Sequence, residues 1–92
     1  GIDIMNSIII TYDLCKPTQN YDSVIEKIKQ YGTYAKLTES CWFIKTIDSC
    51  VSVRNNLLTC LDKNDRLFVA QLTGVAAWAN TIASNEFLSK NL

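Results

Sequence analysis

One aspartate is placed where a carboxylate could do chemistry. In residues 7–13, SIIITYD, five of the six residues before Asp13 are apolar or β-branched, and Pro17 follows closely. Asp13 either ends the strand by accepting hydrogen bonds from N–H groups of the following loop, or binds a hard cation such as Mg²⁺ or Mn²⁺. Thr11, one pleat away on the same strand face, and Ser40 could add hydroxyl ligands or orient a water molecule.

The absence of histidine restricts the kinds of catalysis and metal binding that the chain could perform. The chain contains no histidine, which excludes Ser-His-Asp and Cys-His catalysis and every mixed cysteine-histidine zinc site. Neither of the glycine-rich phosphate-binding patterns, G-x-x-x-x-G-K and G-x-G-x-x-G, occurs. An enzyme built from this sequence would have to use carboxylates, tyrosines, lysines and a bound metal.

The four cysteines, Cys15, Cys41, Cys50 and Cys60, show no C-x-x-C spacing. We expect free thiols that pack as small apolar side chains, and no structural metal, because no secretion signal supports a disulfide framework. The apolar runs are much shorter than the 18 or so residues that a membrane span needs. These features predict a cytoplasmic protein with no membrane partner.

The elements that would position Asp13 follow from the spacing of apolar residues. The pattern predicts strands over residues 7–13, 33–37, 41–46 and 66–73 and helices over residues 20–31 and 48–61. The order strand, helix, strand, strand, helix, strand indicates an α+β fold, a ferredoxin-like βαββαβ sandwich in which two helices cover one face of a four-stranded sheet.

The chain has 92 residues, enough for one domain. We expect Met5 to mark the native start and residues 1–4 to be a remnant of an expression vector. Residues 5–73 would then form the ferredoxin-like domain. Residues 74–92 would form a short C-terminal extension, with one or two helical turns around Trp78 and a last helix over residues 84–92.

The second face of the predicted sheet needs a cover. The first and last strands are apolar on both sides, although both helices can lie on only one side. An apolar face of this size is rarely left open in a monomer. Either the segment with Trp78 folds over it, or a second copy of the chain does. We expect a homodimer through this face, with residues 74–92 at the interface.

The order of several short motifs resembles a known family. These are Tyr12-Asp13 at the end of a strand, Tyr31-Gly32 after a helix, Ser40-Cys41-Trp42 in a hairpin, and Leu61-Asp62-Lys63-Asn64-Asp65 before a strand. The order is similar to that of the Cas-two-like proteins, the small CRISPR-associated proteins that partner the spacer integrase, and of the related virulence-associated protein D toxins. It covers residues 7–72 and is closest to a bacterial branch outside CRISPR loci.

The resemblance implies a ferredoxin-like homodimer, which in this family is either a metal-dependent nuclease or a structural clamp on duplex DNA. It implies that Asp13, one from each subunit, is the catalytic residue and the Mg²⁺ or Mn²⁺ ligand near the two-fold axis. Tyr12, Thr11 and Ser40 would support it. Trp42 stands where the family usually has phenylalanine.

The charge pattern departs from that family. Asn20, Tyr21 and Asp22 stand where arginines commonly begin the first helix, and the formal net charge is zero. Non-specific binding to nucleic acid depends on basic residues, of which Lys16, Lys36 and Lys45 are the candidates. Two functions therefore stay open: a metal-dependent nuclease, and a non-catalytic dimeric adaptor that binds a protein or a nucleic acid.

Overall fold

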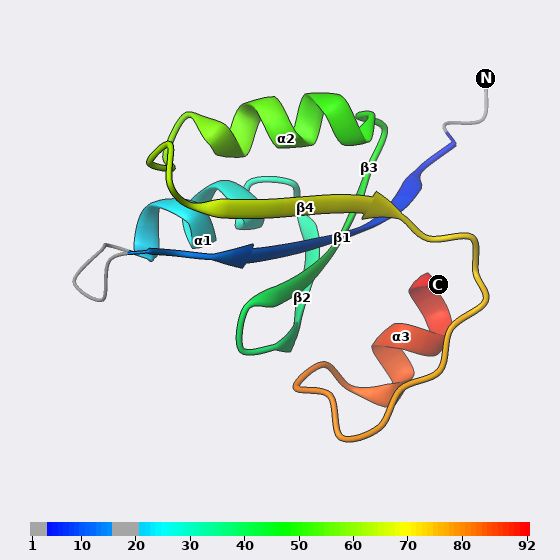
Figure 1. Cartoon of the computed structure of the whole chain (residues 1–92). Coiled ribbons are helices and arrows are strands. Elements are labelled where there is room, and N and C mark those ends of the chain that lie inside the picture. The colour runs from blue at the N-terminus through cyan, green and yellow to red at the C-terminus, as the bar shows by residue number, and fades with distance from the viewer. Residues whose placement is uncertain (1–3, 16–20) are drawn as a thin grey trace.

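The secondary structure alternates between strands and helices in a computed structural model that describes residues 4–15 and 21–92. Figure 1 shows the elements in chain order. They are β1 (Asn6–Asp13), α1 (Asp22–Lys29), β2 (Thr33–Thr38), β3 (Cys41–Thr46), α2 (Cys50–Leu58), β4 (Arg66–Gln71) and α3 (Asn85–Asn91). The prediction of an α+β fold is confirmed.

The four strands form one antiparallel sheet in the order β2-β3-β1-β4. β1 therefore occupies a central position, as its apolar residues on both faces predicted. Side chains alternate between the two faces along each strand. Even-numbered residues of β1 face the helices, and odd-numbered residues, including Thr11 and Asp13, face the opposite side, here called the open face.

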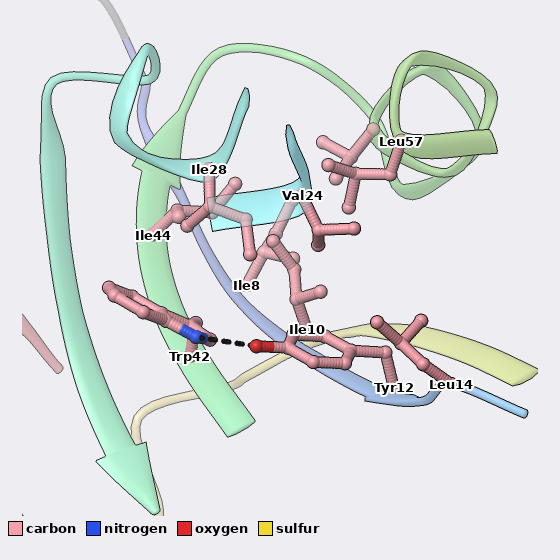
Figure 2. Packing of buried hydrophobic residues seen from close by; sticks show 10 residues of the cluster. Ile8, Ile10, Tyr12, Leu14, Val24, Ile28, Trp42, Ile44 and Leu57 are labelled. Carbon is pink, nitrogen blue, oxygen red and sulfur yellow. Dashed lines mark hydrogen bonds between the residues drawn. The ribbon is translucent and has the colours of Figure 1, made fainter. Parts of the chain in front are cut away.

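The core lies between the sheet and two helices, α1 and α2, which cover the same side (Figure 1). Figure 2 shows its packing. The side chains of Ile8, Ile10, Val24, Ile28, Ile44, Val53 and Leu57 are fully buried. Ser49 caps α2, because its side chain accepts a hydrogen bond from the Ser52 N–H. Burial of these branched side chains is the main force that holds the helices on the sheet.

The C-terminal segment covers part of the open face. Phe87 of α3 meets the fully buried Phe43 of β3 edge-to-face, with ring centroids 5.7 Å apart. The Ile82 N–H donates to the Leu37 carbonyl at 3.0 Å, and the Ser7 hydroxyl donates to the Asn91 carbonyl at 3.2 Å. Of the two covers expected from sequence, the segment with Trp78 therefore occupies this part of the face within a single chain.

Several predicted elements differ from the structure. α1 ends at Lys29 rather than at residue 31, and β4 ends at Gln71 rather than at residue 73. Residues 75–80 form no helix, because Gly74 and Asn80 adopt positive φ angles on either side and the Trp78 indole donates to Asn85 Oδ1. The second helix ends at Leu58 rather than near residue 61. The N–H groups of Thr59, Cys60 and Leu61 bond to carbonyls three residues earlier, which tightens the last turn.

No helix within the described ranges, 4–15 and 21–92, is long and apolar enough to cross a membrane.

Candidate functional site

Asp13 is the last residue of β1 and lies directly opposite Arg66, the first residue of β4. Arg66 Nη1 donates to Asp13 Oδ2 at 3.1 Å. The antiparallel pairing produces this contact, because the end of one strand lies beside the beginning of its neighbour. Both side chains are exposed, Asp13 by 68% and Arg66 by 80%. The carboxylate that the sequence singled out is thus already neutralised by a cation of its own chain.

A shallow pocket of about 170 Å³ surrounds this ion pair. Its lining includes Thr11, Asp13, Arg66 and Phe68. These four residues share the open face, because Thr11 pairs with Phe68 and Asp13 with Arg66 in the strand register. The pocket therefore combines one carboxylate, one hydroxyl and one guanidinium with an aromatic ring that is 62% exposed.

The donor atoms of this pocket do not fit a divalent cation within one chain. Mg²⁺ and Mn²⁺ prefer six oxygen ligands and usually take one or two carboxylates. Asp13 is the only carboxylate lining the pocket, and the Arg66 guanidinium would repel a cation. Within the described residues, no three acidic, cysteine or histidine side chains come together. A metal site would need Asp13 from a second copy.

Another aspartate, Asp65, bonds to the loop that follows β1. Asp65 Oδ1 accepts the Cys15 N–H at 2.9 Å, and Asp65 Oδ2 accepts the Asp62 N–H, in the turn before β4, at 2.8 Å. The Cys15 thiol also donates to the Asn64 carbonyl. The first N–H group after Leu14 is thus bound by Asp65, whereas residues 16–20, to which Asp13 was expected to bond, lie outside the described residues.

The Tyr12 side chain points away from the Asp13 carboxylate. It lies in the helix-side core, where it is 5% exposed and its hydroxyl accepts a hydrogen bond from Trp42 Nε1 at 3.3 Å (Figure 2). The Ser40 carbonyl accepts the Tyr12 N–H at 3.1 Å. Tyr12 and Ser40 line a second pocket, of about 300 Å³, together with Tyr21 and Lys36. Of the predicted supporting residues, Thr11 and Tyr12 therefore line the pocket of Asp13, whereas Ser40 does not.

The candidate lysines do not form one basic patch. Lys36 pairs with Trp42 in the register, on the helix side, and its ammonium lies 3.7 Å from the Glu39 carboxylate. Lys45 lies opposite Ser7, six residues along β1 from Asp13, which is about 20 Å at the usual strand rise. Lys16 lies outside the described residues. The described lysines thus sit on different faces and at different ends of the sheet.

None of the four cysteines forms a disulfide in this structure. Cys41 lies opposite Thr11 in the register, and burial raises the pKa of its thiol. Burial also raises the pKa of the Cys60 thiol, although the nearby Lys27 partly offsets it. Such thiols stay protonated near neutral pH and are poor nucleophiles.

The prediction from sequence missed three residues that line the pocket, Arg66, Leu67 and Phe68. Arg66 carried a signal, because an arginine that begins one strand meets an aspartate that ends its antiparallel neighbour. Phe68 carried none, because a strand that is apolar on both sides does not show which side the rest of the chain will cover.

The described geometry offers an exposed ion pair beside an exposed aromatic ring, which suits binding better than catalysis.

No family model matches the chain, and no match was found among the curated proteins.

Proposed function

We propose that this chain is a ferredoxin-like protein of the Cas-two-like type that acts as a homodimeric, non-catalytic adaptor for another protein. The strand order β2-β3-β1-β4, with antiparallel neighbours and two helices on one face, supports the ferredoxin-like assignment. The order of motifs over residues 7–72 supports the Cas-two-like type. The cytoplasmic location expected from the sequence belongs to the same proposal.

The observation that carries the adaptor function is the ion pair between Asp13 and Arg66, 3.1 Å apart. A catalytic carboxylate that holds a metal must offer its oxygens to the cation. Here one oxygen accepts a guanidinium hydrogen bond, and no second carboxylate lines the pocket. The arrangement favours a polar contact surface over a hydrolytic centre.

The formal net charge of zero and the separated lysines favour a protein partner over a nucleic acid. Nucleic-acid affinity comes largely from the release of counterions when lysines and arginines neutralise phosphates. A chain with no net charge, in which Arg66 and Lys36 already pair with carboxylates, would release few counterions. Binding to duplex DNA or RNA at physiological salt would contradict the choice of a protein partner.

The homodimer rests on the part of the open face that stays uncovered. The C-terminal segment packs near β2 and β3, whereas Phe68 of β4 is 62% exposed. Ile9 and Ala70, which are partly buried, lie opposite each other on the same face. A second copy beside β4 would remove part of this apolar surface from water, at about 25 cal/mol per Å² of apolar surface buried.

A metal-dependent nuclease is the second candidate, favoured by the shared pocket of Thr11 and Asp13 on an exposed face. In that case the carboxylates of two Asp13 residues would together hold Mg²⁺ or Mn²⁺ near a two-fold axis. A cation there would lower the pKa of a water molecule for attack on a phosphodiester. Arg66 would have to release Asp13 first, and it could then contact the phosphate.

The test is a cleavage assay on single- and double-stranded DNA and RNA with Mg²⁺ or Mn²⁺, for the wild type and Asp13→Asn. The adaptor function predicts no metal-dependent cleavage by either protein. Robust cleavage by the wild type that disappears in a folded Asp13→Asn protein would establish the nuclease instead. Arg54→Gln is the matched control, because Arg54 is exposed and lies far from Asp13 in sequence, with its guanidinium donating to Asn55 Oδ1.

A further inference from the structure

The two edges of the sheet differ in how they are protected. The β2 edge carries Lys36, a register irregularity between Lys36 and Thr38, and a hydrogen bond from the Ile82 N–H to the Leu37 carbonyl. Lysines, bulges and covering segments are the usual means by which proteins block strand addition. β4 (Arg66–Gln71) has neither lysine nor proline, and it pairs with β1 without a bulge. No described strand lies beyond β4.

The hydrogen-bond alternation identifies which backbone groups of β4 face outward. The Leu72 N–H donates to the Ser7 carbonyl at 2.7 Å, so even-numbered residues here point their N–H and C=O groups at β1. The odd-numbered residues, Leu67, Val69 and Gln71, therefore point theirs away from the sheet. These three residues present an alternating row of donors and acceptors.

We propose that the β4 strands of two copies pair antiparallel about a two-fold axis at Val69, and so join two sheets into one of eight strands. With Val69 opposite Val69 of the second copy, Leu67 falls opposite Gln71 and Gln71 opposite Leu67. All three outward residues then meet outward residues, and all their N–H and C=O groups are satisfied. This inference rests on the proposed homodimer, and it places the second copy at the β4 edge, beside the open face rather than over it.

The side chains on the open face agree with this register. Phe68 falls beside Ala70 of the second copy, in a non-hydrogen-bonded pair where side chains approach closely. The exposed ring of Phe68 would lie over the small side chain of that alanine, which covers part of its surface. A large residue beside a small one allows close packing without a clash.

The pairing has a consequence for Asp13. In this register the two Asp13 residues lie three strand spacings apart across the sheet and about six residues apart along it. With usual strand spacing and rise, their separation is about 25 Å. Two carboxylates that far apart cannot share one cation, so the paired edges fit the adaptor and not the nuclease.

The first test compares Gln71→Pro with the control Gln71→Ala by light scattering. Proline at position 71 removes an outward N–H and blocks the edge, but it leaves the backbone bonds between β4 and β1 intact. Both variants lose the hydrogen bond from Gln71 Nε2 to Asn6 Oδ1, and only the proline also removes the backbone N–H. We expect wild type and Gln71→Ala to give twice the chain mass and Gln71→Pro to give the mass of one chain, with unchanged far-UV circular dichroism. Retention of the dimer in Gln71→Pro, or its loss in Gln71→Ala, would overturn the edge pairing.

Amide hydrogen exchange of the wild type gives a second readout that requires no substitution. The Leu67, Val69 and Gln71 amides should be protected at concentrations where the protein is a dimer and should lose protection on dilution. A dimer in which these three amides exchange freely would overturn the edge pairing but leave the homodimer standing. A wild-type monomer at all concentrations would overturn both.

Discussion

Asp13 and Arg66 are direct partners in the β1–β4 register, and their charged groups meet at 3.1 Å on the solvent-exposed side of the sheet. The pair joins the residue with the strongest chemical signal in the sequence to one of only two arginines in the chain. The negative charge of Asp13 is therefore balanced locally by Arg66.

We predict that this ion pair contributes little to stability. Both side chains are mostly exposed, and exposed pairs are typically worth about 0–1 kcal/mol. A double-mutant cycle with Asp13→Ala, Arg66→Ala and the double variant, measured by urea unfolding, should give a coupling free energy below about 1 kcal/mol. A coupling of several kcal/mol would mean that the pair is buried in the working state of the protein.

We predict a larger loss for the buried hydroxyl of Tyr12. Tyr12→Phe removes the acceptor of the Trp42 Nε1–H, and both rings are only 5% exposed. Leaving this donor unsatisfied should lower the free energy of unfolding by about 1–3 kcal/mol. Tyr34→Phe is the matched control, because the Tyr34 ring also packs near Trp42, with centroids 6.1 Å apart, but is 38% exposed.

In urea unfolding, the Tyr34→Phe protein should match the wild type within about 0.5 kcal/mol. Equal losses in the two variants would contradict a specific role for the hydrogen bond between Tyr12 and Trp42.

The sequence was sufficient to predict most elements, because burial follows periodicity. β1 is apolar on both faces and is central, and Ser49 and Ser84, at the starts of two predicted helices, cap α2 and α3. Residues 75–80 were predicted as helical turns because small apolar residues are good helix formers. The contact of Trp78 with Asn85 and the positive φ angles of Gly74 and Asn80 override that propensity.

The candidate site was only partly predictable. The sequence placed Thr11 and Asp13 together, because residues two apart on a strand share a face. The same alternation put the Tyr12 side chain on the other face, but it could not show which of the two faces the helices cover. Nor could the sequence assign the bond from the Cys15 N–H to Asp65, because that contact spans 50 residues of sequence.

We predict that the four thiols differ in reactivity in the native protein. Cys15 is exposed and the other three are partly buried, so Ellman's reagent should modify Cys15 first. Burial raises the pKa of Cys41 and Cys60 above the ordinary value of 9.0, which slows both further. Equal rates for all four thiols, or fewer than four in the denatured, unreduced protein, would contradict this assignment.

The raised pKa values of the Cys41 and Cys60 thiols also determine how the stability of the fold changes with pH. The folded protein retains the Cys41 and Cys60 protons at a pH where the unfolded chain has lost them. The stability that the two protonated thiols contribute is therefore fully present below about pH 9, the pKa of a thiol in the unfolded chain. It is lost as the pH rises through the higher pKa of the same thiols in the folded protein. In urea unfolding above that pH, Cys41→Ala should lose less stability with rising pH than the wild type does. A steeper loss of stability with rising pH in Cys41→Ala than in the wild type would contradict this prediction.

The central claim, a homodimer formed by this chain, is tested most directly by sedimentation equilibrium of the wild-type protein at micromolar concentrations. The account predicts a molar mass about twice the 10.4 kDa of one chain, with dissociation on dilution. It also predicts that EDTA leaves this mass unchanged, because no metal joins the two copies. A mass of 10.4 kDa throughout, or a dimer that falls apart in EDTA and re-forms with Mg²⁺ or Mn²⁺, would contradict it.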